Sequence, residues 1–200
     1  MPTGDSTGLI GAVGDNIDMN LLLAFAPFLA FALLDRLVGT TVGLVTAAII
    51  AAGLLARDAF STNRKVKILE VGTFLLFGGL AVYTVLVSVA WSIVGVRLCV
   101  DAGLLVVVLV SMLVGQPFTL QYAKEKVAPE FWSTPEFTRT NYVITAVWAA
   151  AFAVMVVADV VMLYVPAVPI KVGIWVTILA LLGAVKFTGW YPERNSKPVA

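Results

Sequence analysis

Six apolar runs dominate the chain, and only short polar segments separate them. A transmembrane helix needs about 20 mostly apolar residues, and these runs approach or reach that length. Hydrophobic residues fill 60% of the positions and the mean hydropathy is +1.00, whereas soluble domains contain roughly 45–50% apolar residues. A soluble chain of this size has too little polar surface to cover so much apolar surface. The sequence therefore predicts an all-α, polytopic bundle that is embedded in a lipid bilayer.

The apolar runs set the expected boundaries. Residues 1–18 form a polar leader without the basic start of a signal peptide, residues 19–190 form the transmembrane domain, and residues 191–200 form a polar tail. Pro27 is expected to kink the first span, because a proline inside a helix lacks an N–H donor. The six expected spans are Met19–Leu34, Thr40–Ala56, Val71–Ala90, Arg97–Val114, Asn141–Val165 and Ile170–Gly189.

The third and fourth spans are the hardest to separate, because residues 71–96 contain no charged side chain. A short turn is expected over Trp91–Val96. In the third span, Gly72, Gly78 and Gly79 predict a closely packed helix face, since small residues let helix backbones approach each other.

The basic residues are distributed unevenly between the two sides. With six spans, Arg36, Arg97 and Lys171 lie on one side. Cytoplasmic connections of membrane proteins are enriched in Lys and Arg, so the side richer in these residues, which carries both termini and both long connectors, is predicted to be cytoplasmic. That side holds ten basic residues: Arg57, Arg64, Lys65, Lys67, Lys124, Lys126, Arg139, Lys186, Arg194 and Lys197.

The longest polar segment runs from residue 115 to 141 and mixes charges with aromatic side chains, as is typical of a membrane surface. Pro117 suits the first turn of a helix, so an interfacial helix is expected over Phe118–Val127, and Ser133 or Thr134 is expected to cap a turn leading into the fifth span. This segment is either a membrane-lying anchor, or a docking surface or cytoplasmic gate. Its candidate interaction residues are Gln116, Phe118, Tyr122, Glu125, Trp132, Arg139 and Asn141.

A second polar group lies on the opposite side of the bundle. Asp159 and Lys171 are expected to pair across a short turn, and Arg97 and Asp101 share one helix face because they are four residues apart. The group is either an outward-facing pocket for a solute, an ion or a lipid head group, or a set of structural ion pairs near the membrane surface. Its members are Asp35, Arg36, Arg97, Asp101, Asp159 and Lys171.

Composition narrows the chemistry. The chain has no histidine and a single cysteine, Cys99. An intrachain disulfide and a histidine-dependent catalytic triad are therefore excluded, and the usual ligand sets for zinc, haem and iron–sulfur clusters are missing. A net charge of +1 gives no reason to expect nucleic acid, and no phosphate-binding loop occurs. We expect a protein that is not an enzyme and that has no cofactor.

Several short stretches resemble the septation protein A family of bacterial inner-membrane proteins. These stretches are Ala26-Pro27-Phe28, Asn63-Arg64-Lys65-Val66, Phe77-Gly78-Gly79-Leu80, Gln116-Pro117-Phe118 with Trp132, Asn141, Trp148 and Lys171-Val172. The connector over residues 129–140 is longer than in that family, and Asp35 and Asp159 have no clear acidic counterpart there. The resemblance implies a bacterial inner-membrane protein that maintains the cell envelope and septum through contacts with other membrane proteins.

Four functions follow from these observations. The first is a component of the envelope or division machinery that binds other membrane proteins or a second copy of itself through its cytoplasmic connectors. The second is a small transporter or channel that uses the outward-facing charged group. An accessory subunit of a larger membrane complex is the third. A lipid-modifying enzyme is least favoured, because the carboxylates lie beside basic residues that lower their pKa and make them poor general bases.

Overall fold

The computed structural model describes residues 23–62, 65–165 and 167–195, and within them the secondary structure is helical without any strand. Five helices, α3, α4, α5, α7 and α8, are long and apolar enough to cross a membrane, which confirms the predicted membrane-type helical fold. The elements are α2 (Ala26–Leu37), α3 (Thr40–Ala59), α4 (Ile68–Val87), α5 (Ile93–Leu113), α6 (Phe118–Ala123), the 3₁₀ turn η1 (Pro129–Phe131), α7 (Pro135–Tyr164) and α8 (Ile170–Asn195).

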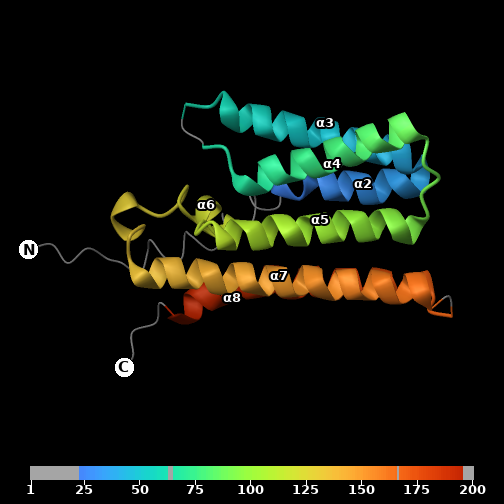
Figure 1. Ribbon diagram of the computed structural model, residues 1–200. Helices are drawn as coiled ribbons and strands as arrows, with labels where there is room; N and C mark the ends of the chain where they lie inside the picture. Colours follow the sequence, from blue (N-terminus) through green and yellow to red (C-terminus); the bar gives the residue numbers. More distant parts are fainter. Residues whose placement is uncertain (1–22, 63–64, 166, 196–200) are drawn as a thin grey trace, which may run out of the picture.

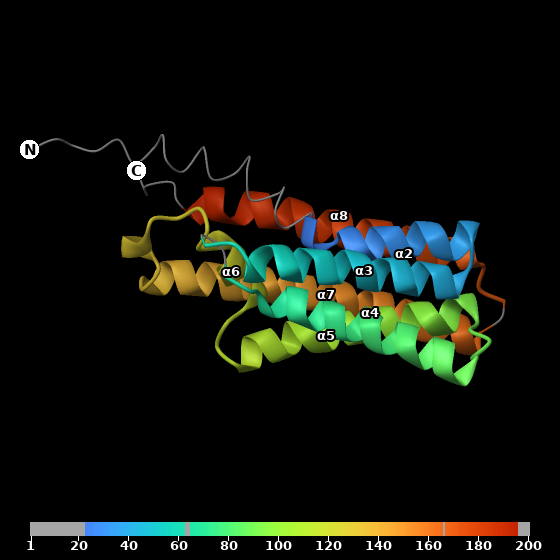
Figure 2. The same cartoon turned by 90° about the horizontal axis from the view of Figure 1, so that it is seen from above.

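The long helices run along one common axis (Figures 1 and 2), and the order in which neighbouring helices pack describes a ring. Helix α2 packs against α3, α3 against α4, α4 against α5, α5 against α7, and α7 against α8. Between α2 and α8, the described residues show no comparably close backbone packing. The ring therefore has one open seam, which we call the α2–α8 seam.

The connections divide between the two ends of the bundle (Figure 1). The α2–α3, α4–α5 and α7–α8 turns lie at one end, which we call the Arg97 end. The α3–α4 connector, α6 and the last turn of α8 lie at the other, the Lys67 end. Of the described basic residues, only Arg36, Arg97 and Lys171 belong to the Arg97 end, so the predicted uneven division of charge is confirmed. Arg64 and Lys197 lie outside the described residues.

Helix α2 occupies part of the first expected span. Residues 19–22 of that span and the polar leader lie outside the described residues. A turn at Phe25 separates the helical residues Leu23 and Ala24 from α2, and Pro27 lies in the first turn of α2. The break expected around this proline is therefore present. Within its 12 residues, α2 is too short to count among the helices that can cross a membrane.

The turn between the third and fourth spans lies earlier than the sequence suggested. Helix α4 ends at Val87, and Ser88 adopts a left-handed conformation with φ of 52°. The Ser92 side chain then accepts a hydrogen bond of 3.0 Å from the Gly95 N–H and caps α5. The expected turn over Trp91–Val96 is thus corrected to residues 88–92, because the serine cap starts the helix before the first charged residue.

Other helix ends also extend beyond the apolar runs. Helix α7 begins at Pro135, where the Thr134 hydroxyl accepts a 3.3 Å hydrogen bond from the Phe137 N–H, so the expected cap is confirmed. Helix α8 continues past Gly189 to Asn195, with Pro192 inside it. Polar residues can extend a helix beyond the bilayer, which hydropathy alone does not reveal.

Only one of the three expected glycine contacts in α4 is present. A Cβ atom on Gly72 would lie 2.5 Å from Val107 Cγ1, whereas nothing lies within 4 Å of a Cβ built on Gly78 or Gly79. From the opposite helix, a Cβ on Gly103 would lie 2.3 Å from Leu76 Cδ1. The close approach of α4 to α5 therefore rests on Gly72 and Gly103, and the predicted role of Gly78 and Gly79 is wrong.

An aromatic cluster fills the middle of the ring. Trp148 of α7 stacks on Phe25 with 4.9 Å between ring centroids, and its ring also contacts Phe118 and Phe152. The Trp148 Nε1–H donates a 2.9 Å hydrogen bond to Thr188 Oγ1 on α8. Buried tryptophan thus has both its apolar body and its N–H satisfied, and the cluster separates the two ends of the bundle.

Candidate functional site

A cavity of about 540 Å³ lies at the α2–α8 seam. Side chains of α2, α5, α7 and α8 line it, and most of its wall is apolar, with aromatic rings that include Phe28, Trp148 and Phe152. Ligand cavities in proteins commonly measure about 300–1,000 Å³ and combine an apolar wall with a few polar groups. Here the polar groups are the charged residues Asp35, Arg36, Arg97 and Asp101, together with the hydroxyl of Thr177.

Arg97 organises the charged side of the cavity. Its Nη2 lies 3.4 Å from Asp159 Oδ1 and donates a 3.0 Å hydrogen bond to Thr177 Oγ1 on α8. Asp159 is completely buried, and the Arg97 side chain is 16% exposed. The expected pairing of Asp159 with Lys171 is wrong, because the arginine of α5 reaches this carboxylate and Lys171 is exposed at the start of α8.

Asp101 is the second buried carboxyl group at this end. It is 8% exposed and lines the cavity one helical turn from Arg97, as the spacing of the two residues predicts. Its carboxyl group also interacts with that of Asp159. Neither oxygen of Asp159 receives a hydrogen bond from an N–H or O–H group of the described residues. Two carboxyl groups thus share one guanidinium in a largely apolar environment.

The remaining members of the predicted outer group lie further away. Asp35 lines the cavity and accepts a 2.5 Å hydrogen bond from Thr40 Oγ1, which ties it to the start of α3. Arg36 lines the cavity and is exposed. Of the six predicted residues, four line one cavity, Asp159 lies behind Arg97, and Lys171 is not part of the site.

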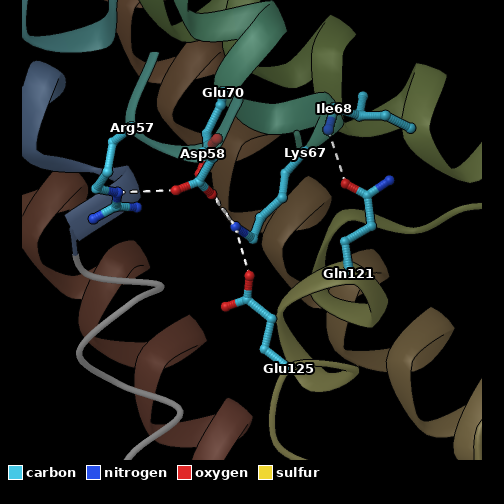
Figure 3. A network of polar contacts seen from close by, with 7 residues as sticks. All are labelled: Arg57, Asp58, Lys67, Ile68, Glu70, Gln121 and Glu125. Atoms are coloured by element: carbon cyan, nitrogen blue, oxygen red, sulfur yellow. Dashed lines mark hydrogen bonds and ion pairs between the residues drawn. The ribbon is translucent and has the colours of Figure 1, made fainter. Parts of the chain in front are cut away.

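A second charged site lies at the Lys67 end (Figure 3). Lys67 is 2% exposed and its Nζ donates to Asp58, lies 2.8 Å from Glu125 Oε1 and lies 3.4 Å from Glu70 Oε1. The Arg57 Nε–H donates a 2.9 Å hydrogen bond to Asp58. We call these five residues the Lys67 cluster. It joins the end of α3, the start of α4 and the segment after α6.

Two neighbours complete this cluster. The Lys67 Nζ lies 5.0 Å from the centroid of the Tyr122 ring, a distance typical of a cation–π contact. Gln121 Oε1 accepts a 2.8 Å hydrogen bond from the Ile68 N–H, which is otherwise one of the unpaired donors at the start of α4. The α6 segment is thus joined to the start of α4 by the ion pair of Glu125 with Lys67 and by the hydrogen bond between Gln121 and the Ile68 N–H.

The surroundings of Lys67 and Tyr122 favour one protonation state for each. Burial opposes the charge on Lys67, but hydrogen bonds to Asp58 and Glu125 outweigh it and raise the pKa of the ammonium group. Burial, together with the nearby carboxylates, raises the pKa of the Tyr122 hydroxyl well above its usual value. At neutral pH, Lys67 is therefore charged and Tyr122 is neutral.

The structure changes the predicted interaction surface. Phe118, Tyr122 and Asn141 are buried, so the expectation that they belong to an exposed surface is wrong. Thr119 of α6 donates a 2.9 Å hydrogen bond to the Asn141 carbonyl on α7, which holds α6 inside the protein. Gln116 and Arg139 are exposed. Trp132 is half-buried beneath Lys124 Nζ, and the Glu125 side chain is 20% exposed beside Lys67.

The comparisons with known proteins leave the site to be interpreted from its own chemistry. The chain matches no family model, no curated protein and no solved structure. Among the described residues, no group of three or more His, Cys, Asp or Glu side chains is arranged to hold a metal ion. In both charged sites, the groups available for binding an ion or a proton are carboxyl, ammonium and guanidinium groups.

Sequence reasoning missed the centre of the Lys67 cluster. In the sequence, Lys67 is only one of ten basic residues on the predicted cytoplasmic side and Asp58 has no assigned role, whereas both side chains are buried. A signal was available: Asp58 directly precedes one end of the connector and Lys67 the start of the next helix, so a tight connection between antiparallel helices places them near each other. Thr177 was also missed, since a lone threonine in an apolar helix usually bonds its own backbone, as this one does to the Gly173 carbonyl.

Proposed function

We propose that this protein is a small membrane carrier that binds an amphipathic molecule in the cavity at the α2–α8 seam. The observation that supports the proposal is the combination of a cavity of about 540 Å³, an aromatic wall, and charged groups confined to one side. The apolar part of the ligand packs against Phe28, Trp148 and Phe152. Its polar group lies beside Arg97 and Asp101.

The asymmetry of the bundle supports transport rather than binding alone. The cavity extends from the Arg97 end to Trp148, and beyond that ring Phe118, Tyr122 and the Lys67 cluster fill the bundle. A carrier that exposes its binding site to one side at a time needs a closed opposite side. In this arrangement the Lys67 end is the closed side.

Location and orientation are part of the same proposal. The Lys67 end contains most of the basic residues, so we place it in the cytoplasm and the Arg97 end on the outer side of the bilayer. The resemblance to the septation protein A family favours the bacterial inner membrane. The proposed topology has six spans, and the first of them, Met19–Leu34, overlaps α2.

The experiment that tests this function blocks the cavity from one wall. Ile178 lines the cavity, whereas its neighbour Leu179 is exposed and does not line it. In purified protein in lipid nanodiscs, Ile178→Trp is expected to weaken binding of amphipathic ligands about ten-fold or more, the loss of roughly 1.4 kcal/mol. The matched variant Leu179→Trp leaves binding unchanged. Equal binding by both variants, or no binding by the wild type to any amphiphile, contradicts the proposal.

A transport assay separates carrying from binding. Protein reconstituted into liposomes is expected to accelerate uptake of a bound amphiphile over protein-free liposomes, and Ile178→Trp is expected to remove the acceleration. If the wild type binds the amphiphile but does not accelerate its uptake, the protein binds ligands without transporting them and the carrier function is contradicted.

A second candidate is a partner-binding component of the envelope or division machinery. The observation in its favour is Phe131, which is 53% exposed in the connector between α6 and α7, on the same segment as the exposed Gln116 and Arg139. Phe131→Ser is expected to lose membrane-protein partners that co-purify with the wild type after mild solubilisation. Tyr164 is an even more exposed aromatic residue at the Arg97 end, and Tyr164→Ser is the control that is expected to retain them.

A further inference from the structure

The charge balance of the cavity defines which amphiphile fits it. Around Arg97, two buried carboxyl groups face a single guanidinium, because both Asp101 and Asp159 interact with it. Asp35 and Arg36, which also line the cavity, cancel each other in formal charge. With both carboxyl groups ionised, the site carries one excess negative charge in a membrane-embedded position.

An uncompensated charge at this depth is unfavourable, since polar groups inside a bilayer are stable only when paired, hydrated or neutralised. The described part of α8 offers Thr177 but no pairing cation, since Lys171 is exposed and makes no ion pair there. On α4, which packs against α5, Glu70 belongs to the Lys67 cluster and Tyr83 packs against Trp91. The excess charge must therefore be neutralised by a proton or by a bound cation.

We propose that the ligand is a cationic amphiphile and that it exchanges with a proton held by the Asp101–Asp159 pair. This inference rests on the proposed binding function of the cavity. In the empty state, one proton lies on the carboxyl pair. When the cation binds beside Asp101, the carboxyl O–H bond breaks, one proton leaves to solvent and the ligand's positive charge replaces it, so the net charge of the site is conserved.

The wall of the cavity suits the same class of ligand. Aromatic faces attract cations and pack against apolar groups, so rings such as Phe28 and Phe152 serve both parts of a lipophilic cation. Asp101 is the carboxyl group that reaches the cavity, whereas Asp159 lies behind it, held by Arg97. Asp101 is thus the residue that contacts the cation, and Asp159 is a positioning residue that keeps Arg97 occupied.

The test compares two probes of nearly the same size and opposite charge. Tetraphenylphosphonium and tetraphenylborate are titrated into the full-length protein in lipid nanodiscs, with protein-free nanodiscs as the baseline for partitioning into lipid. The cation is expected to bind at least about ten-fold more tightly than the anion, and its binding is expected to release about one proton per site into weakly buffered solution. Equal or tighter binding of the anion overturns the inference.

Substitutions of Asp101 test whether this carboxyl group causes the charge preference and the proton release. Asp101→Asn is expected to remove both the charge preference and the proton release, while Asp101→Glu retains them. Glu136→Gln is the control for general surface charge and is expected to retain both as well, because Glu136 is exposed at the start of α7 and does not line the cavity. Proton release that persists in Asp101→Asn overturns the assignment to this pair.

The outcomes separate this inference from the proposed function. If neither probe binds and no amphiphile of any charge binds, the proposed function of the cavity fails. If the anion or a neutral amphiphile binds in an Ile178-dependent way and the cation does not, the function stands and the cationic specificity fails. A phospholipid that co-purifies in the cavity and is not displaced by the cation also overturns the specificity.

Discussion

The two ends of the bundle hold charged clusters of similar composition but different construction. Each contains one more carboxyl group than cation: three against two around Lys67, and two against one around Arg97. Lys67 contacts three carboxylates and an aromatic ring, whereas Arg97 contacts one carboxylate at 3.4 Å and a threonine. Only the Arg97 site borders a cavity.

The difference separates two roles of buried charged residues, one in holding the structure together and one in binding. Where several partners surround one cation, the charges hold segments together, here α3, α4 and α6. Where the partners are too few and a cavity lies beside them, the imbalance provides a reason to bind something else. A buried charge is therefore informative about function mainly through what remains unsatisfied around it.

The largest expected effect comes from removing Lys67. Lys67→Met leaves Glu70 buried without its cation and removes one of the cations that pair with Asp58. Breaking a buried ion pair from one side typically costs about 3–5 kcal/mol. Arg97→Met is the matched variant at the other end, and we expect a smaller loss because the cavity admits water to the remaining carboxylates. Thermal unfolding in detergent, followed by circular dichroism, measures both. A smaller loss for Lys67→Met than for Arg97→Met would falsify the distinction drawn between the two clusters.

Neutralising one carboxylate at each end should act in different ways. Asp58→Asn weakens hydrogen bonds to both Arg57 and Lys67 and is expected to destabilise the protein by about 1–3 kcal/mol. Asp101→Asn replaces one carboxyl group of the singly protonated Asp101–Asp159 pair by a neutral amide and is expected to leave stability unchanged or raised. The same unfolding measurement tests the pair. Equal destabilisation by the two variants would indicate that both clusters are purely structural.

Two tyrosine hydroxyl groups sharpen the comparison on a smaller scale. Among the described residues, the buried Tyr122 hydroxyl has no hydrogen-bond partner, whereas the Tyr142 hydroxyl donates a hydrogen bond of 3.2 Å to the Met112 carbonyl. Tyr122→Phe keeps the ring beside Lys67 and is expected to be neutral or slightly stabilising. Tyr142→Phe is expected to lose about 1 kcal/mol. If Tyr122→Phe is the more destabilising variant, its hydroxyl has a role at the Lys67 end that this structure does not contain.

The smallest expected effect concerns pH: the contribution of Lys67 itself to stability is retained between pH 7 and 9. Because the pKa of Lys67 is raised in the folded state, its contribution is complete below the unfolded value of 10.5 and is lost as pH rises further. The raised pKa of Tyr122 acts in the same direction, since the unfolded chain releases that proton first. We expect Lys67→Met to unfold at a lower temperature than the wild type throughout pH 7 to 9, by a difference that does not shrink as the pH rises, because the buried carboxyl groups that lose this cation only become more fully ionised. A difference that shrinks across this range contradicts the charged state assigned to Lys67.

Hydropathy was sufficient for the fold class and for the side on which most charges lie, because both depend on long apolar runs and on their order. It was insufficient for the turn at residues 88–92, since Ser92 caps α5 inside an uncharged stretch. Phe118 and Tyr122 resemble interfacial anchors in sequence, yet α6 folds back and packs against α7. Spacing within a helix correctly placed Arg97 near Asp101, whereas the partner of Asp159 depended on the packing of α5 against α7, which no local pattern encodes.

The open seam between α2 and α8 decides where a ligand comes from. Leu29 and Ile178 line the cavity and remain exposed, so the opening of the cavity is apolar and lies on the side of the bundle. Under the proposed function, a ligand enters through this opening from the bilayer, where lipophilic compounds reach higher concentrations than in water. Occupancy of the cavity then depends on how strongly a compound partitions into lipid as well as on how well it fits. A weak intrinsic affinity is sufficient when the ligand is concentrated in the bilayer.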